Sequence, residues 1–295
     1  SSPLAVGMSG NFRQMKRRIL NIAVFRKETL YQKMRALIIY LVISAVFIGC
    51  TPILSIDAST QSVYHFSDTD KNISLLDISE TFGTYDGSFV LYDNNLDSWK
   101  IYDLEEATKR IPPESTYKIY DALLGLESGI ITPEHSSMTW NGDAFPFPSW
   151  EADQDLNSAM QNSVNWYFQA IDSQLGINRV QEFLNKIEYG NQTTSSNLDL
   201  YWSDFSLKIS PLEQVTLLKK FNTNEFHLNS QNVFSVKNAI KIASTPNGNF
   251  YGKTGTGRVN GQDINGWFIG YVETSDNSYY FATNIQSDSN ATGKK

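Results

Sequence analysis

Hydrophobic and polar positions divide the chain into an uncharged stretch near the N-terminus and a long region of mixed pattern. From Ala36 to Ile56 there are 21 residues without a charge, and 16 of them are apolar. A helix rises about 1.5 Å per residue, so this length just crosses a hydrocarbon core of roughly 30 Å. A buried helix of a globular domain is the alternative, but so long an uncharged run favours a transmembrane helix over residues 36–56.

Strand and helix patterns then follow one another in an order typical of one fold class. Residues 88–93 and 99–103 are rich in aromatic and branched side chains and flank a polar turn, which predicts a hairpin. Strands at both ends of the domain with helices between them predict an α/β (α+β) fold, an antiparallel β-sheet flanked by helices with an inserted helical subdomain. Helical patterns occur at 115–128, 156–170, 176–188, 211–221 and 230–243, and later strand patterns at 249–254, 264–273 and 278–286.

The net charge of −7 is distributed unevenly along the chain. Residues 1–35 hold eight Lys and Arg against one acid, whereas the other 260 residues hold 16 bases and 30 acids. Lys and Arg concentrate on the cytoplasmic side of membrane spans. We therefore expect residues 1–35 to be a cytoplasmic basic segment and residues from 57 onward to lie outside a bacterial cell membrane. An acidic outer region also argues against nucleic acid as a partner.

The single cysteine, Cys50, permits another interpretation of the N-terminal region. Met34-Arg35 followed by an apolar run that ends at Cys50 is typical of a bacterial lipoprotein signal, in which Cys50 would be lipid-modified. Residues 9–33, however, alternate apolar and basic positions at roughly helical spacing, which suits a helix on the cytoplasmic membrane surface. The spanning helix is favoured, and lipid modification of Cys50 stays open.

Residues 57–85 are rich in Ser, Asp and Thr and show little periodicity. This composition predicts an extracellular linker that contains a short helix. The folded domain is then expected to occupy residues 86–295. One cysteine excludes an internal disulfide framework, and three scattered histidines predict no metal site.

Candidate chemistry begins with Ser115-Thr-Tyr-Lys118, which directly follows a pair of prolines. If Ser115 opens a helix, Lys118 lies three residues later on the same face, within reach of the hydroxyl. A lysine can activate a serine nucleophile only if burial or neighbouring charges depress its pKa. A Ser-x-x-Lys motif by itself also occurs at ordinary helix starts.

Two further motifs follow, Ser163-Val-Asn165 on a predicted helix and Lys253-Thr-Gly-Thr-Gly257 on a predicted strand. In the second, glycine lets a ligand approach the strand, while Lys253 and the threonine hydroxyls offer a carboxylate a charge and hydrogen-bond donors. Each motif alone is compatible with polar surface. In this order, however, Ser-x-x-Lys, Ser-x-Asn and Lys-Thr-Gly form the signature of penicillin-recognising serine enzymes.

The sequence between the motifs narrows this resemblance. Trp150-Glu-Ala-Asp-Gln-Asp-Leu156, Trp166-Tyr-Phe-Gln169, Tyr189-Gly-Asn191 and Leu207-Lys-Ile-Ser-Pro-Leu-Glu213 resemble class D β-lactamases, and more closely the extracellular sensor domains of the BlaR/MecR β-lactam receptors. The resemblance implies the fold of serine β-lactamases and penicillin-binding proteins. It also implies a C-terminal helix packed on the sheet, and we expect this helix to be missing from the chain.

The resemblance implies the following chemistry at the nucleophile. Ser115 attacks the β-lactam carbonyl, and carbon dioxide carboxylates Lys118, whose carbamate then serves as the general base; no other cofactor and no metal is implied. A carbamate is a base near neutral pH, whereas a lysine ammonium has no lone pair to accept a proton. Trp150 matches the indole that hydrogen-bonds this carbamate, with an ordinary core tryptophan as the alternative.

The resemblance also assigns residues to substrate binding and proton transfer. Ser163 relays a proton toward the leaving nitrogen, and Lys253 and Thr254 hold the substrate carboxylate. The backbone N–H groups of Ser115 and Thr256 form an oxyanion hole, which stabilises the charge that develops on the attacked carbonyl.

One position separates a receptor from a hydrolase. Class D hydrolases carry a valine where this chain has Asn165, and the receptor sensors resemble this chain in having asparagine. An asparagine carbonyl can accept a hydrogen bond from a free Lys118 amine, so that acylated Ser115 is left without a base and persists. We therefore expect a β-lactam receptor with negligible turnover that signals across the membrane to induce resistance genes. The alternative is a membrane- or lipid-anchored class D β-lactamase that hydrolyses β-lactams.

The expected partners are β-lactam antibiotics, the membrane and an upstream zinc-protease domain of the same receptor. In the receptor family that domain cleaves a cytoplasmic repressor after the sensor is acylated. Its H-E-x-x-H motif is absent from this chain. We therefore interpret the chain as the C-terminal part of such a receptor.

Overall fold

The structure is a computed structural model that describes residues 62–67 and 71–294. The basic segment 1–35, the expected transmembrane helix 36–56 and Cys50 lie outside these residues. Within the described part of the chain, no helix is both long enough and apolar enough to cross a membrane.

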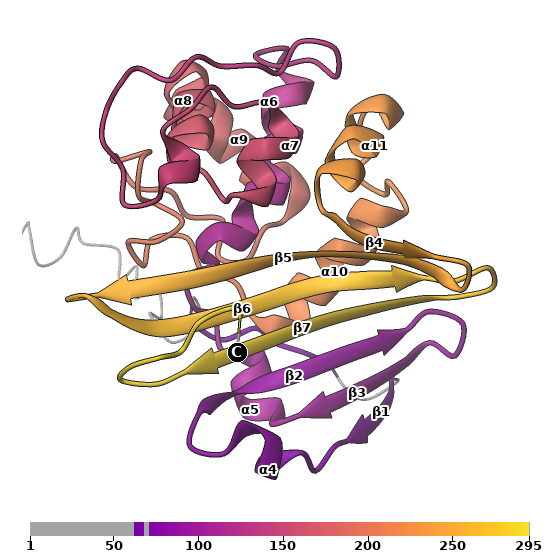
Figure 1. The fold of residues 1–295 in the computed structure, drawn as a ribbon. Coiled ribbons are helices and arrows are strands. Elements are labelled where there is room, and N and C mark those ends of the chain that lie inside the picture. The colour runs from indigo at the N-terminus through magenta and orange to yellow at the C-terminus, as the bar shows by residue number, and fades with distance from the viewer. Residues whose placement is uncertain (1–61, 68–70, 295) are drawn as a thin grey trace, which may run out of the picture. The chain divides into compact units, whose positions relative to one another are not determined.

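One sheet of seven strands forms the base of the domain (Figure 1). Its order is β1-β3-β2-β7-β6-β5-β4, and all neighbours are antiparallel except β1 and β3. The prediction of an antiparallel sheet built from both ends of the domain is confirmed. The strands are β1 (Asn72–Leu75), β2 (Asp86–Asp93), β3 (Ser98–Tyr102), β4 (Lys241–Thr245), β5 (Gly248–Val259), β6 (Gln262–Glu273) and β7 (Ser278–Gln286).

A row of apolar side chains crosses the middle of this sheet. Ile101 pairs with Val90, Val90 with Ala282, Ala282 with Ile269, and Ile269 with Lys253. The four apolar members are fully buried. Because cross-strand partners point to the same face, Lys253 extends this buried row toward the side chains that cover the sheet.

Two strands lie where none was predicted. β1 belongs to the segment 57–85 that was interpreted as a linker; the short helix expected there is α4 (Ser79–Phe82). β4 occupies the end of the predicted helix 230–243, because α11 (Ser230–Ala239) stops earlier. All five residues of β4 are exposed, so it has no buried face whose alternation could reveal a strand. β4 is extended because its backbone pairs with that of β5.

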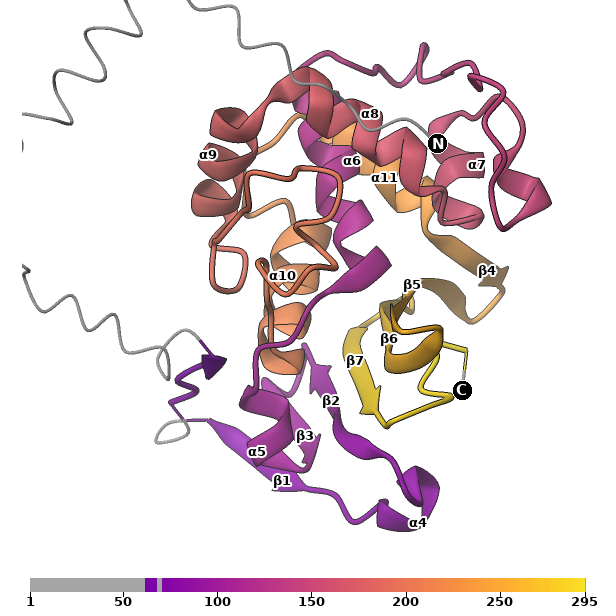
Figure 2. The same cartoon turned by 90° about the vertical axis from the view of Figure 1, so that its left-hand side faces the viewer.

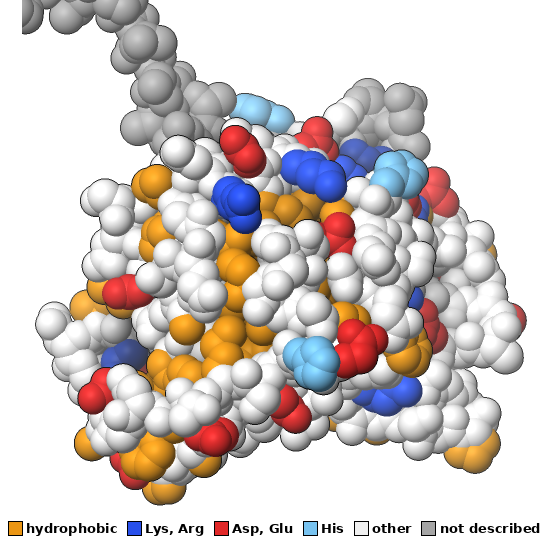
Figure 3. All heavy atoms as spheres, turned by 90° about the horizontal axis from the view of Figure 1, so that it is seen from above, with side chains coloured by type: hydrophobic (Ala, Val, Ile, Leu, Met, Phe, Trp, Pro, Cys, Tyr) orange, Lys and Arg blue, Asp and Glu red, His pale blue; other side chains and the backbone are white. Residues whose placement is uncertain are grey.

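Helices cover one face of the sheet, as Figures 1 and 2 show from two directions. α10 (Pro211–Asn222) packs on β2, β6 and β7. α6 (Lys118–Glu127) packs against α8 (Asn165–Leu175) and α11. Seen from above, the helical layer shows a band of hydrophobic side chains with charged side chains of both signs around it (Figure 3). The other helices of the described residues are α5 (Leu104–Thr108), η1 (Glu114–Tyr117), η2 (Pro148–Trp150), α7 (Leu156–Gln161) and α9 (Ile177–Ile187).

The helix predicted over 156–170 is two helices, α7 and α8. A capping box starts α7: the Asp155 carboxylate accepts from the Ser158 N–H, and the Ser158 hydroxyl accepts from the Asp155 N–H. The break lies at Ser163, whose φ of 56° is left-handed, and at Val164, which is extended. The expectation that Ser163 sits on a helix was wrong, because its backbone conformation cannot continue one. The break turns its hydroxyl toward β5.

Candidate active site

The candidate nucleophile lies at the junction of η1 and α6. Pro113 precedes η1 directly, and Glu114 follows with a left-handed φ of 52°. The Glu114 N–H donates to the carbonyl oxygen of Trp202 at 3.1 Å, and the Thr116 hydroxyl donates to the carbonyl oxygen of Pro113 at 2.6 Å. These contacts hold the turn in place and leave Ser115 half-buried between buried neighbours.

Lys118 lies directly beneath the serine hydroxyl. Its Nζ donates to Ser115 Oγ at 2.9 Å and to Asn165 Oδ1 at 2.7 Å. The side chain is fully buried, and this burial lowers the pKa of Lys118 to about 7, although the negative charges of Asp121 and Glu114 oppose the shift. Near neutral pH a large fraction of Lys118 is therefore a free amine, which can accept a proton or react with carbon dioxide.

Two aromatic rings close the space around the lysine nitrogen. Lys118 Nζ lies 5.6 Å from the ring centroid of Phe168 and 5.5 Å from that of Trp202. Both rings are almost fully buried. They exclude water from the nitrogen, and their faces attract its charged form when it is protonated.

The tryptophan beside Lys118 is therefore Trp202, and not Trp150 as the sequence resemblance suggested. The Trp150 indole N–H donates to the carbonyl oxygen of Asn162 at 3.0 Å, and its ring packs on Phe145 and Phe147. Trp150 is held there because η2 lies in the long loop before α7. The signal that was missed is the aromatic pair at 201–202 in the loop between α9 and α10.

Ser163 and Lys253 form a second hydrogen-bonded pair near Lys118. Lys253 Nζ donates to Ser163 Oγ at 2.8 Å and to the carbonyl oxygen of Thr254 at 2.9 Å. Burial, and then the positive charge of Lys118, hold the pKa of Lys253 well below its ordinary value. A ligand carboxylate beside Lys253 would restore its ammonium form, because an opposite charge favours the ionised state.

The strand β5 approaches the nucleophile through Gly255. A Cβ placed on Gly255 would lie 3.1 Å from the carbonyl oxygen of Pro113 and 3.2 Å from the backbone nitrogen of Ser115. Only a residue without a side chain leaves the backbone of β5 this close to η1 without displacement. Thr254 and Thr256 flank this contact: Thr254 is half-buried, and the exposed Thr256 accepts the Gly293 N–H on its hydroxyl at 3.1 Å.

A cavity of about 360 Å³ lies beside Lys253 and Thr254, and Ser115 is not among its lining residues. It lies between the end of α7 and the strands β4 and β5. Lys253 and Thr254, the two residues expected to hold a substrate carboxylate, line it. The other lining residues are Met160, Gln161, Ala239, Ile240, Lys241, Ile242, Gly252 and Phe268.

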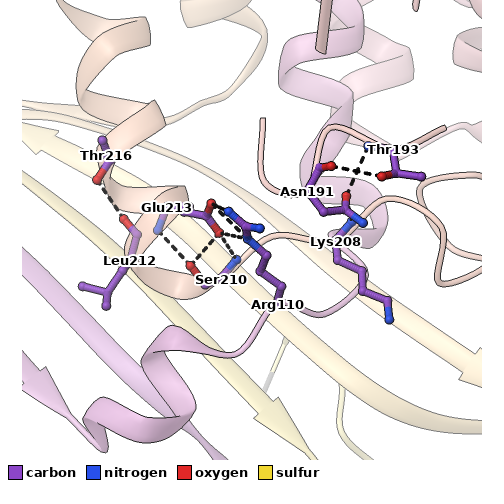
Figure 4. Close-up of polar contacts among 8 residues, drawn as sticks. All are labelled: Arg110, Asn191, Thr193, Lys208, Ser210, Leu212, Glu213 and Thr216. Atoms are coloured by element: carbon purple, nitrogen blue, oxygen red, sulfur yellow. Dashed lines mark hydrogen bonds and ion pairs between the residues drawn. The ribbon is translucent and has the colours of Figure 1, made fainter. Parts of the chain in front are cut away.

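An ion pair anchors the chain that enters the nucleophile turn. The Arg110 guanidinium binds both carboxylate oxygens of Glu213, with N–O distances of 2.5 to 3.1 Å (Figure 4). Glu213 also accepts from the Ser210 N–H and hydroxyl, and Ser210 caps α10 in return. This network fixes the segment before Pro113 to the start of α10.

Hydrogen bonds join five of the sequence-predicted residues, and Thr254 and Thr256 lie on either side of Gly255, where β5 approaches the nucleophile turn. Ser115, Lys118 and Asn165 form one hydrogen-bonded chain, and Ser163 and Lys253 form a second. Such a constellation places a serine hydroxyl next to a desolvated amine, as nucleophilic acyl transfer requires.

Comparison with known proteins identifies the family of this chain. The model of the penicillin binding protein transpeptidase domain matches residues 83–295. The regulatory protein BlaR1 of Bacillus licheniformis is 43% identical over 99% of this chain and 49% of its own length. The methicillin resistance mecR1 protein of Staphylococcus aureus is 37% identical over 95% of this chain and 47% of its own length. The chain therefore spans about half the length of these relatives.

Solved structures of the same family have a fold similar to that of the described domain. The C-terminal domain of the Bacillus licheniformis BlaR penicillin-receptor is 46% identical with a TM-score of 0.73, covering 76% of this chain and 92% of that one. A class D β-lactamase from Sebaldella termitidis is 30% identical with a TM-score of 0.70, covering 74% and 89%. This chain belongs to the penicillin-binding protein transpeptidase family, in the group that holds the BlaR1/MecR1 sensor domains and the class D β-lactamases.

Proposed function

We propose that this chain is the β-lactam-binding part of a BlaR1/MecR1-type receptor, in which Ser115 is acylated by the antibiotic and remains acylated. The relatives that match almost the whole chain are named as regulatory and resistance proteins, and the solved domain is named as a penicillin receptor. The acylated protein, rather than a hydrolysed antibiotic, is then the species that carries the signal.

The hydrogen bond from Lys118 Nζ to Asn165 Oδ1 carries this proposal. Deacylation needs a base to activate water, and a carboxylated Lys118 would supply it. Asn165 offers an acceptor to the uncarboxylated nitrogen at 2.7 Å, which stabilises the amine or ammonium form in preference to the carbamate. Without the carbamate, the base that would activate water for deacylation is missing, and we expect the acyl bond to persist.

Carbon dioxide is the one co-reactant in this proposal. The lowered pKa of Lys118 favours the free amine that carbon dioxide requires, and Trp202 lies beside the nitrogen, where its indole can contact a carbamate. Carboxylated Lys118 would then take the proton of Ser115 during acylation.

The cellular setting is part of the proposal. The uncharged run 36–56 and the basic segment 1–35 suit a membrane anchor with the binding domain outside the cell. Because the chain covers only about half of BlaR1 and mecR1, an upstream zinc-protease domain would receive the signal.

The test is intact-mass measurement after benzylpenicillin, combined with steady-state hydrolysis of nitrocefin in bicarbonate. We expect one stoichiometric adduct that lasts for hours and a single burst without turnover. Asn165→Val removes the acceptor and should shorten the adduct lifetime, whereas Asn157→Val, an exposed site on α7, should not. Many turnovers per minute by the parent chain would instead identify a class D β-lactamase.

A further inference from the structure

A row of amide side chains crosses the sheet next to the nucleophile turn (residues 112–115). Its members are Asn265 on β6 and Asn284 and Gln286 on β7. Asn284 Nδ2 donates to Asn265 Oδ1 at 2.9 Å, and Gln286 Nε2 donates to Asn284 Oδ1 at 3.2 Å. Asn265 and Asn284 are buried, and buried polar groups disfavour folding unless they are hydrogen-bonded. The bond from Asn284 directs the Asn265 oxygen toward β7, so that the Asn265 nitrogen faces the turn.

Asn265 connects this row to the nucleophile turn. Its Nδ2 donates to the carbonyl oxygen of Pro112 at 3.1 Å and to Glu114 Oε1 at 3.3 Å. Trp267, two residues later on the same face of β6, donates its indole N–H to the same Pro112 oxygen at 2.8 Å. Two buried side chains of one strand therefore bind the turn to the sheet. Neither residue belongs to the three sequence motifs of the site.

Glu114 is the residue of the turn that most needs this support. Its φ of 52° is left-handed, a conformation that is uncommon for a residue with a side chain. Such a conformation persists only when surrounding contacts fix it. Glu114 is fixed from two directions: its N–H donates to the carbonyl oxygen of Trp202 at 3.1 Å, and its carboxyl group accepts from Asn265. Because the next peptide bond contains the Ser115 nitrogen, the backbone of Glu114 sets the direction of the Ser115 N–H.

Gly257 makes room for the Glu114 carboxyl group. It is the strand partner of Asn265 on β5. A Cβ placed on Gly257 would overlap Oε1 of Glu114 and lie 3.1 Å from Cβ of Asn265. Any side chain at this position would therefore displace the carboxyl group from its hydrogen bond with Asn265. The second glycine of Lys253-Thr-Gly-Thr-Gly257 is thus part of the same arrangement.

We propose that Asn265 and Glu114 are positioning residues, which hold the backbone nitrogen of Ser115 in place for acylation. Asn265 anchors the nucleophile turn to the sheet, and Glu114 carries this constraint to the peptide bond of Ser115. In acylation the Ser115 hydroxyl oxygen bonds to the β-lactam carbonyl carbon, the ring C–N bond breaks, and the hydroxyl proton ends on the ring nitrogen. Negative charge develops on the carbonyl oxygen, and an N–H group stabilises it only when the donor points at that oxygen.

This inference rests on the proposed function, because it requires acylation of Ser115, but it does not depend on how long the adduct lasts. Asn265 and Glu114 act through the turn, and neither is expected to touch the antibiotic. Their removal should therefore slow the chemical step and leave binding of the antibiotic unchanged. Loss of an entire oxyanion donor costs about 10²–10³-fold in rate, and a displaced donor should cost less.

Stopped-flow fluorescence of the full chain with a labelled penicillin tests this, over a series of penicillin concentrations. The series separates the dissociation constant of the initial complex from the first-order rate constant of acylation. For Asn265→Ala we expect a rate constant about tenfold lower and a dissociation constant within about twofold of the parent. Glu114→Ala should lower the rate constant by a smaller factor, because Asn265 and Trp267 still hold Pro112.

Two further variants examine the contact between the two residues. Burial raises the pKa of Glu114 to about 8, so at neutral pH its side chain is largely protonated and glutamine matches its charge. Glu114→Gln keeps an acceptor for Asn265 and should recover most of the rate lost in Glu114→Ala. The double variant Glu114→Ala/Asn265→Ala should be no slower than Asn265→Ala, since both changes remove the same hydrogen bond.

Asn232→Ala on α11 is the matched control. Asn232 is 8% exposed, against 6% for Asn265, and its Nδ2 donates to Glu127 Oε1 at 2.7 Å. Glu127 ends α6, at the opposite end from Lys118. The control thus removes a buried amide that binds a carboxyl group without touching the nucleophile turn, and both constants should stay within about twofold of the parent.

Folding of each variant is checked by thermal melting. If Asn265→Ala does not fold, the comparison of Glu114→Ala with Glu114→Gln still decides the question. An unchanged rate constant in folded Asn265→Ala would overturn the proposal, and so would an equal loss in Asn232→Ala or a Glu114→Gln variant as slow as Glu114→Ala. Rapid nitrocefin turnover by the parent would refute the sensor function alone, because the acylation rate constants would still test the two positioning residues.

Discussion

At the scale of single residues, the protonation state of Lys118 should make the acylation rate depend on pH. Burial lowers its pKa to about 7, so below that pH it is an ammonium without a lone pair and above it a free amine. Direct proton abstraction and carboxylation both require the unprotonated nitrogen. We therefore expect the acylation rate constant to rise with pH and level off above about 7, measured by stopped-flow fluorescence with a labelled penicillin. A rate constant that is flat between pH 6 and 8 would contradict this role.

The variant Lys118→Ala tests the role of the base while the nucleophile Ser115 is still present. In Lys118→Ala the hydroxyl of Ser115 loses its hydrogen-bond partner at 2.9 Å, and acylation should slow by about 10²–10⁴-fold. The same stopped-flow assay measures this effect, and a circular dichroism spectrum like that of the parent serves as the control for folding. Near-normal acylation would mean that another group is the base.

Ser115→Ala removes the only group expected to form the covalent bond. The mass increase caused by benzylpenicillin should disappear completely, because the oxygen that is acylated is gone. Loss of the base in Lys118→Ala would instead leave an adduct that forms slowly at Ser115. Intact-mass spectrometry after long incubation measures this. An adduct on another residue, such as Ser163, would refute the assignment of the nucleophile.

At the scale of elements, the junction between the nucleophile turn and α10 depends on one largely buried ion pair. The side chains of Arg110 and Glu213 are only 16% and 8% exposed. Arg110→Ala leaves the carboxylate without its cation, and we expect it to lower the free energy of unfolding by about 3 kcal/mol, measured by urea denaturation. Glu188→Ala is the matched control: its pair with Lys220 is 70% and 30% exposed and should contribute less than about 1 kcal/mol.

The elements also show where local pattern fails. Strands β2, β3, β5, β6 and β7 were predicted because their alternation or apolar runs reflect a buried face. β4 was missed since every side chain in it is exposed, and the break at Ser163 was missed because the amino acids around it are acceptable in a helix. β4 is a strand because it pairs with β5, and the break at Ser163 accompanies the contact of its hydroxyl with Lys253.

For the whole molecule, the charge step across residues 36–56 predicts the topology. Protease added to intact cells should digest the domain after residue 57, while an N-terminal tag stays protected, because Lys and Arg near the span remain in the cytoplasm. Immunoblotting for the tag measures this, with permeabilised cells as the control. A mature chain that starts at a lipid-modified Cys50 would replace the spanning helix by a lipid anchor.

The amino-acid sequence by itself determined the antiparallel sheet, because strand alternation is a local pattern. It also determined the three motifs, whose order carries the family resemblance that selects Ser115, Lys118 and Lys253. Tertiary structure decided which distant side chains meet. Trp202 lies beside Lys118 and Asn265 beside Glu114, although 84 and 151 residues separate the members of these pairs in the sequence. No local pattern encodes such contacts, since they arise only when the loop after α9 packs against α6 and the strand β6 against the turn before it. Burial then sets the pKa values on which the chemistry depends, and burial is a property of the folded chain.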